Sequence, residues 1–181
     1  CGFTLAPCAA KDKAMVVRNL QRAEDIPPQA MEAGIDWRWT TFPEFLDTLA
    51  SLPKGINYSG YIGHAAIRTF VMGERAFDQR ATEDDLAAME RSLREAIRAG
   101  AMGFTTSRTT KHKAKDGRFT PSLSASEAEL LGIAAGMKRA GFQLAAGEFP
   151  VAGIDLARRP LREQELAAVG AQQDGRGDLD D

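Results

Sequence analysis

The sequence is short of the residues that build disulfide frameworks and metal sites. It has two cysteines and two histidines among 181 residues, and six residues separate Cys1 from Cys8. Two cysteines are too few for a secreted domain held by disulfide bonds, and their spacing fits neither a CxxC redox motif nor a zinc knuckle. We therefore expect free thiols in a reducing cytoplasm. With two histidines, the chain cannot supply a complete site of two or three histidine ligands.

Long apolar runs and an excess of one charge are also missing. No stretch approaches the roughly twenty apolar residues of a membrane span, and no charged-then-apolar leader precedes Cys1. The net charge of −2 gives no footprint for nucleic acid or anionic membranes. We expect a cytoplasmic globular protein with no nucleic-acid and no membrane partner. Because the chain does not begin with Met, we also expect a piece of a longer protein.

What the sequence contains is an alternation of β-prone segments and amphipathic helices. Strands are predicted at 2–7, 56–64, 100–107 and 142–147, with helices between them. This alternation implies parallel strands joined by crossover connections. The predicted fold class is α/β, as a partial (β/α)8 TIM barrel of about four consecutive βα units; an open doubly wound sheet is the alternative. Residues 1–149 form this domain, and 150–181 lose the alternation and are expected to be a disordered or truncated tail.

Capping boxes mark the helix starts. A Ser or Thr precedes an acidic residue by three positions at Thr41-x-x-Glu44, Thr82-x-x-Asp85 and Ser124-x-x-Glu127. Residues 26–41 show no clean period, contain both tryptophans and are interpreted as a long packed loop. Residues 66–81 are ambiguous.

Several side chains that can carry chemistry follow predicted strands. His64 ends the second one; in barrels such residues face the active site, although a histidine bonded to a neighbouring loop is the plain alternative. Ser107, Arg108 and Thr109 end the third. The guanidinium of Arg108 could pair with a substrate carboxylate or with a loop acid. His112, in a Lys-rich loop, is interpreted as a solvated surface residue.

Cys1 stands at the start of the first predicted strand. A thiolate is a metal ligand or a nucleophile, whereas free cysteines are most often small buried side chains. On the residues alone, the buried role is favoured for Cys1, and more strongly for Cys8.

Four blocks occur in order: CGFTLAPC, the long stretch from AEDIPPQ to YIGHAAIR, VMGERAF and EAIRAGAMGFTTSRT. Together they resemble the N-acyl-D-amino-acid deacylase (D-aminoacylase) family of the amidohydrolase superfamily, over about residues 1–147. The resemblance implies a metal-dependent hydrolase on a (β/α)8 barrel that cleaves C–N bonds other than peptide bonds. It implies an N-acyl amino acid as the small-molecule substrate and Zn2+ as the cofactor, which would polarise the amide carbonyl and activate water.

The resemblance also assigns residues. Cys1 aligns with the family's zinc-ligand cysteine and is therefore predicted to bind metal, against the buried role. His64 matches a Gly-His at the active-site mouth, so it is predicted to line the substrate together with Ser107, Arg108 and Thr109. The family's other ligands and its catalytic Asp have no counterpart in the chain. No catalytic residue is predicted, and the chain alone is expected to be inactive.

Two alternatives remain open. D-aminoacylases proper carry Gly-Leu-Ala-Tyr where this chain has Ser107-Arg108-Thr109-Thr110, so the substrate could instead be a different linear or cyclic amide. A non-catalytic half-barrel that binds a partner chain through its unpaired strand edges is the other reading. With such edges open, we expect the isolated chain to be poorly soluble or partly unfolded.

Overall fold

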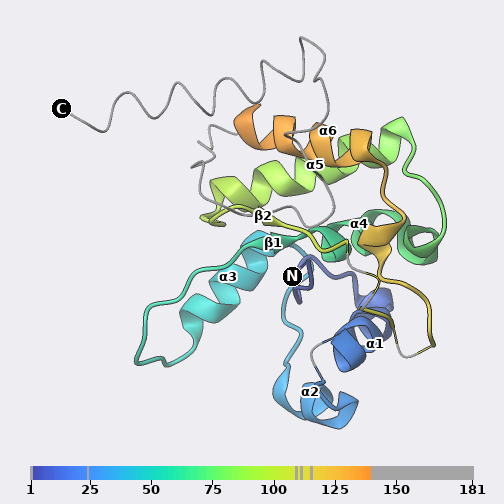
Figure 1. Ribbon diagram of the computed structural model, residues 1–181. Helices are drawn as coiled ribbons and strands as arrows, with labels where there is room; N and C mark the ends of the chain where they lie inside the picture. Colours follow the sequence, from blue (N-terminus) through green and yellow to red (C-terminus); the bar gives the residue numbers. More distant parts are fainter. Residues whose placement is uncertain (1, 24, 109, 111, 115, 140–181) are drawn as a thin grey trace, which may run out of the picture.

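The computed structural model describes residues 2–139, apart from 24, 109, 111 and 115. The predicted strand at 142–147 and the predicted tail at 150–181 lie outside the described residues. Helices dominate the rest (Figure 1): α1 (Lys13–Ala23), α2 (Pro28–Gly34), α3 (Phe42–Ser51), α4 (His64–Met72), α5 (Glu83–Arg98) and α6 (Glu127–Arg139), with the 3-10 turns η1 (Ala10–Asp12), η2 (Gly73–Phe77) and η3 (Pro121–Leu123).

Two short strands, β1 (Ile62–Gly63) and β2 (Phe104–Thr105), form the described sheet. They pair in parallel, with Ile62 opposite Phe104. The predicted parallel pairing is thus confirmed for these two strands, which α4, η2 and α5 connect. Both strands are far shorter than predicted. In the first predicted range, residues 56–59 are exposed and lie outside the pairing of β1 with β2.

The segment 2–7, predicted as a strand, is not one among the described residues. The backbone carbonyl of Gly2 accepts a hydrogen bond from the amide of Ala65 at 3.1 Å. The next contact goes to a side chain, because the amide of Gly63 donates to the hydroxyl of Thr4 at 3.2 Å. Pro7 has no amide hydrogen to continue a ladder. The segment therefore runs beside β1 without joining the sheet.

The predicted helix starts are confirmed for α3 and α5. Thr41 and Thr82 each accept from a backbone amide three residues on, and the acids there bond back to the cap. For α6 the predicted box at Ser124 is wrong by two residues. The hydroxyl of Ser126 accepts from the amide of Glu129 at 3.1 Å, whereas Ser124 donates to the carbonyl of Ala76 at 3.0 Å.

Two segments contain helices that were not predicted from the sequence. Within 26–41, α2 begins at Pro28, whose missing amide hydrogen costs nothing in a first helical turn. The rest of this segment packs as predicted, since buried Trp39 donates its indole N–H to the carbonyl of Leu5 at 2.9 Å. The ambiguous stretch 66–81 is α4 followed by η2, and Gly73 ends α4 at φ 60°.

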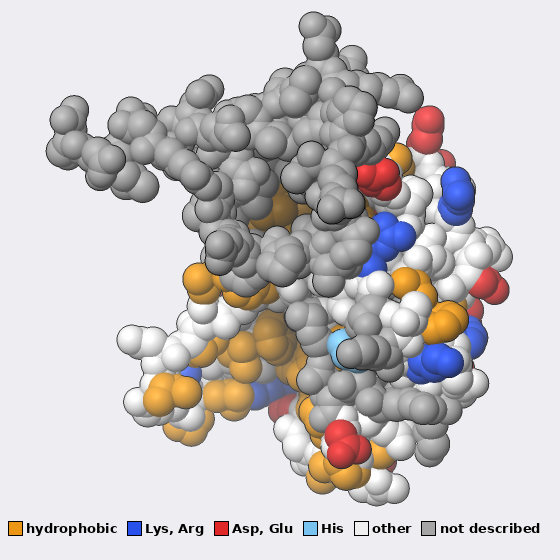
Figure 2. Space-filling model, viewed as in Figure 1, with side chains coloured by type: hydrophobic (Ala, Val, Ile, Leu, Met, Phe, Trp, Pro, Cys, Tyr) orange, Lys and Arg blue, Asp and Glu red, His pale blue; other side chains and the backbone are white. Residues whose placement is uncertain are grey.

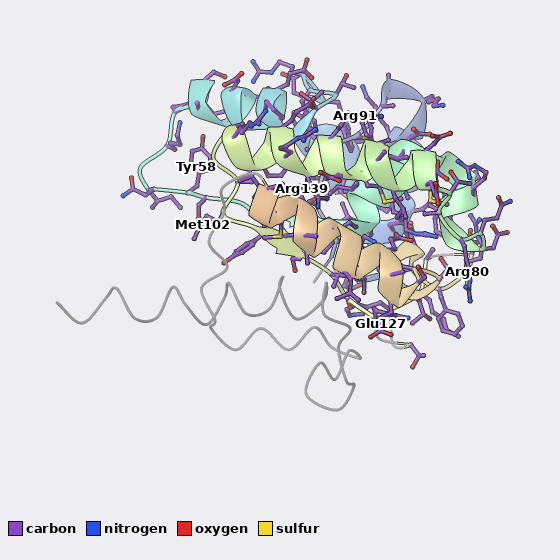
Figure 3. The ribbon with its side chains drawn as sticks, turned by 90° about the horizontal axis from the view of Figure 1, so that it is seen from above. Tyr58, Arg80, Arg91, Met102, Glu127 and Arg139 are labelled. Carbon is purple, nitrogen blue, oxygen red and sulfur yellow. The ribbon has the colours of Figure 1, made fainter. Side chains whose placement is uncertain are left out.

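The main core lies where α3, α4, α5 and α6 pack around β1. Its fully buried members include Ile62, Ile67, Met89 and Leu93. Helices α5 and α6 lie side by side (Figures 1 and 3), and Arg139 of α6 donates to Glu90 of α5 at 2.7 Å. A smaller core under α1 and α2 contains Cys8, Val16, Leu20 and Met31. Among the described helices, none is both long and apolar enough to span a membrane.

Candidate functional site

Three segments meet at the carboxyl ends of β1 and β2. A Cβ on Gly63 would stand 2.5 Å from the carbonyl oxygen of Gly2, and a Cβ on Gly2 would stand 3.1 Å from Cα of Thr106. The N-terminal segment therefore packs backbone against backbone on both strand ends. Such approach is possible because neither glycine carries a side chain.

His64 occupies this junction as the first residue of α4, and it is fully buried. Its Nε2 lies 2.9 Å from Oε1 of Glu129, and its Nδ1 lies 2.9 Å from the hydroxyl of Thr106. Burial lowers the pKa of His64, although the nearby Glu129 carboxylate opposes this shift. A carboxylate only accepts hydrogen bonds, so Nε2 carries the proton. In a neutral ring Nδ1 then accepts from Thr106.

Arg68, one helical turn after His64, is also fully buried. Its Nε lies 3.4 Å from Oε1 of Glu129, and another guanidinium nitrogen donates to the carbonyl of Gln79. Burial lowers the pKa of Arg68, and the Glu129 carboxylate acts against that shift. The second oxygen of Glu129 has no hydrogen-bond partner among the described residues. One buried carboxylate thus contacts both the guanidinium of Arg68 and the imidazole of His64.

The wall after β2 is made of Ser107, Arg108 and His112. The hydroxyl of the nearly buried Ser107 lies 3.4 Å from Nδ1 of His112, whose ring meets that of Phe3 edge to face at 5.6 Å. His112 is half-buried, so it is less exposed than the interpretation as a solvated surface residue predicts. Arg108 is half-buried and takes part in none of the ion pairs between described residues.

The structure thus brings together three of the five predicted site residues: His64, Ser107 and Arg108. Cys1 and Thr109 lie outside the described residues. Sequence reasoning missed Thr106, Arg68 and Glu129. A signal for the last was present, because Glu129 is an acid on the apolar stripe of its helix, directly before Leu130 and one turn before Ile133, both of them buried.

Metal-binding donors are scarce in the described part of the chain. Within it, no three side chains of His, Cys, Asp or Glu gather closely enough to hold an ion. Both ring nitrogens of His64 already have protein partners. Cys8 is buried, and desolvation raises its pKa to about 11, so it stays a thiol. The predicted buried role of Cys8 is confirmed.

Comparison with known proteins reveals relatives over part of the chain. A D-aminoacylase of Alcaligenes xylosoxydans xylosoxydans is 29% identical over 106 residues, which is 59% of this chain and 19% of that protein. An N-acyl-D-aspartate deacylase of the same organism is 32% identical over 127 residues, or 69% of this chain and 20% of that protein. Part of the chain is thus D-aminoacylase-like. No protein-family model matches it.

Solved structures agree at the level of the fold. A D-aminoacylase crystal structure, described as defining a novel subset of amidohydrolases, superimposes with a TM-score of 0.53 at 23% identity. That match covers 97% of this chain and 31% of the other. A second D-aminoacylase structure, described by its binuclear metal centre, gives a TM-score of 0.50 at 23% identity over 83% of this chain and 27% of that one. The chain spans about a fifth of the length of the two curated relatives.

Proposed function

We propose that this D-aminoacylase-like chain forms part of the substrate wall of an amidohydrolase that cleaves the amide bond of an N-acyl-D-amino acid. The observation that carries the proposal is the meeting of Gly2, His64 and Ser107 at the carboxyl ends of two parallel strands. In barrel enzymes this end holds the active site. The proposal includes a (β/α)8 barrel, of which β1, α4, α5, β2 and α6 would be consecutive parts.

Within that wall, Arg108 is proposed to bind the free carboxylate of the substrate. It is half-buried, directly follows Ser107 and has no acidic partner among the described residues. A guanidinium that no protein acid neutralises attracts a planar carboxylate, which it can hold through two N–H donors. Ser107 and Thr109 are proposed to line the same wall.

The test compares ligands that differ only in this carboxylate. Saturation-transfer NMR would measure binding of N-acetyl-D-aspartate and N-acetyl-D-methionine, and of their carboxamides, to the chain. We expect the carboxylates to bind at least about tenfold more tightly, as for one charge-assisted pair. Arg108→Gln should abolish that preference, and Arg91→Gln, on the exposed face of α5, should keep it. Equal binding of acids and carboxamides by the unchanged chain would refute the role of Arg108.

The metal is a separate part of the proposal. The described residues do not form a metal site by themselves, so Zn2+ would need Cys1 and ligands beyond those described. Bound at such a site, zinc would act as a Lewis acid on the amide carbonyl. Native mass spectrometry of the chain and of Cys1→Ala measures zinc stoichiometry directly. One equivalent that disappears in the variant supports Cys1 as a ligand, whereas equal zinc in both would rule it out.

We also propose that the chain alone is catalytically inactive, because the family's other metal ligands and its catalytic Asp have no counterpart in the chain, and no group of described side chains could hold a metal ion. Incubation with N-acetyl-D-amino acids and added zinc, with release of free amine as the readout, should show no hydrolysis above buffer. Measurable turnover would contradict this part of the proposal and leave the carboxylate site untouched.

A further inference from the structure

The contacts of His64 do not suit a residue that touches substrate or metal. Its side chain has 0% exposure, and both ring nitrogens lie 2.9 Å from protein oxygens. A ligand would have to displace Thr106 or Glu129 to reach either nitrogen. Displacing Glu129 would leave the buried guanidinium of Arg68 without its counter-ion, at a cost that a weak ligand does not repay.

The partners of His64 come from different parts of the chain. Thr106 is 42 residues away, directly after β2, and Glu129 is 65 residues away in the first turn of α6. His64 itself opens α4 directly after β1. The imidazole is therefore a bridge between the ends of both strands and the following helix.

We propose that His64 is a positioning residue: its neutral imidazole clamps the end of β2 to α6 and so fixes where Ser107 and Arg108 present their side chains. The proposal rests on the proposed function only for the role of Arg108. The direction of the hydrogen bonds follows from the chemistry of the partners. Glu129 can only accept, so His64 donates through Nε2 and accepts through Nδ1 from the Thr106 hydroxyl.

The charges around the ring support a neutral clamp. Glu129 reaches it from α6, Arg68 from α4 and Arg108 from the segment after β2. A protonated imidazole would place a second cation beside Arg68, and Glu129 is the carboxylate that lies within 3.4 Å of both groups. The neutral ring leaves that carboxylate free to balance the guanidinium.

The chain has only two histidines, so the ring can be observed directly. Long-range 1H–15N NMR on labelled chain, with His112→Gln for assignment, reports the protonation and tautomer of each ring. We expect the neutral ring of His64 to carry its proton on Nε2, to become protonated only below its usual pKa of 6.5, and to be unaffected by added Zn2+. Protonation of His64 at or above pH 6.5, the opposite tautomer, or a zinc-dependent shift would overturn the proposal.

The clamp itself is tested at Thr106. Thr106→Val removes the hydroxyl with little change of shape and should shift the His64 ring signals and the backbone amides of Ser107 and Arg108. Thr106→Ser keeps the hydroxyl and should restore them. Unmoved amides in the valine variant would show that His64 does not position this segment. If the unchanged chain binds carboxylates and carboxamides equally while the ring signals of His64 are as expected, only the proposed function is refuted.

A second readout does not require well-resolved spectra. Carbethoxylation by diethylpyrocarbonate, followed by mass spectrometry, should modify His64 at least about tenfold more slowly than His112, because modification of the buried ring needs local opening. Urea should equalise the two rates. Equal rates in buffer would mean that the ring is accessible, and the proposal would fail.

Discussion

At the scale of single residues, the buried ion pair of Arg68 and Glu129 is the charged interaction whose disruption should lower the free energy of unfolding most. Both side chains are at most 1% exposed. Glu129→Gln would still accept from His64 but would leave a buried guanidinium without a counter-ion. We expect the free energy of unfolding to fall by about 3–5 kcal/mol, measured by urea denaturation. The matched control is Glu83→Gln, an exposed acid in the first turn of α5, with an effect within about 0.5 kcal/mol.

A rescue variant separates this charge effect from general damage. Arg68→Met combined with Glu129→Leu removes both charges and keeps apolar volume, so it should be more stable than Glu129→Gln alone. If the double variant is no more stable than Glu129→Gln, the unpaired guanidinium is not the cause of the loss and the prediction is wrong.

The neutral state of His64 predicts a pH dependence of stability. Its folded pKa lies below its usual value of 6.5 because the ring is buried. The unfolded chain therefore binds more protons than the folded one just below pH 6.5. The contribution of the neutral His64 to the free energy of unfolding is complete above that pH and is lost as the pH falls. One proton accounts for at most about 1.4 kcal/mol per pH unit.

The measurement is urea unfolding of His112→Gln at pH 5, 6, 7 and 8, which leaves one histidine. Asp85 does not interfere in this window. Arg75 holds the pKa of Asp85 near about 2 in the folded state, against 3.8 unfolded, so the contribution of Asp85 is lost only below pH 3.8. A flat profile between pH 5 and 8 would argue against a neutral buried His64.

At the scale of elements, local signals succeeded where local chemistry decides. Capping boxes marked the starts of α3 and α5 because the cap side chain, the amide it serves and the returning acid all lie within three residues. The predicted box at Ser124 does not form: its hydroxyl donates to the carbonyls of Ala76 and Pro121, and Ser126 accepts from the amide of Glu129 instead. The lengths of β1 and β2 could not be predicted from the sequence, because a strand extends only as far as the neighbouring strand pairs with it.

The cap of α5 gives a quantitative prediction. Thr82 accepts from the amide of Asp85 at 3.2 Å, and Thr82→Ala removes that acceptor. We expect a loss of about 1 kcal/mol in the free energy of unfolding. Thr82→Ser keeps the acceptor and should lie within a few tenths of the unchanged chain, so equal losses in the two variants would show that the methyl group, rather than the cap, matters.

Gly63 gives a prediction about close packing. An added Cβ would meet the carbonyl oxygen of Gly2 at 2.5 Å, and backbone cannot yield as a flexible side chain does. Gly63→Ala should therefore destabilise by about 1–3 kcal/mol, as overpacking does. Gly34→Ala is the control, since nothing lies within 4 Å of a Cβ there. If the two variants unfold at the same urea concentration, the N-terminal segment is not packed on β1 in solution.

At the scale of the whole molecule, one surface is more apolar than a free chain usually tolerates. Ile56 is 78% exposed, and Leu52, Tyr58, Tyr61 and Met102 are between 37% and 47% exposed. The amide of Met102 donates to the carbonyl of Gly60, which joins Met102 to this segment. Figure 2 shows hydrophobic side chains gathered near α3 on this side, and Tyr58 and Met102 lie at the same end of the molecule in Figure 3.

This surface predicts self-association of the isolated chain. Ile56→Lys should raise the monomer fraction, because it places a charge in the most exposed part of the apolar segment. Size-exclusion chromatography with light scattering gives the readout, and Ala30→Lys, on exposed α2, controls for added charge alone. The expectation fails if both variants change the monomer fraction equally.

The candidate site was only partly predictable from the sequence. Strand-end reasoning pointed to His64, Ser107 and Arg108, which lie directly after or close to the ends of β1 and β2. It could not find the hydrogen bonds of His64 to Thr106 and Glu129. These partners are 42 and 65 residues away in the chain, and no sequence periodicity spans such separations. Resemblance suggested a role for His64 at the substrate, but only the packing revealed that both ring nitrogens have partners.

The junction at His64 also sets an order of events during synthesis. Gly2 and Thr4 are synthesised about 60 residues before their backbone partners, which lie beyond residue 60, and the ring of His64 can contact Glu129 only after a further 65 residues have been made. Until α6 emerges, Arg68 can stay hydrated and the strand ends are not fastened. Ribosome-bound chains that stop before residue 129 should therefore be cleaved by protease near residue 64, and chains that expose α6 should resist.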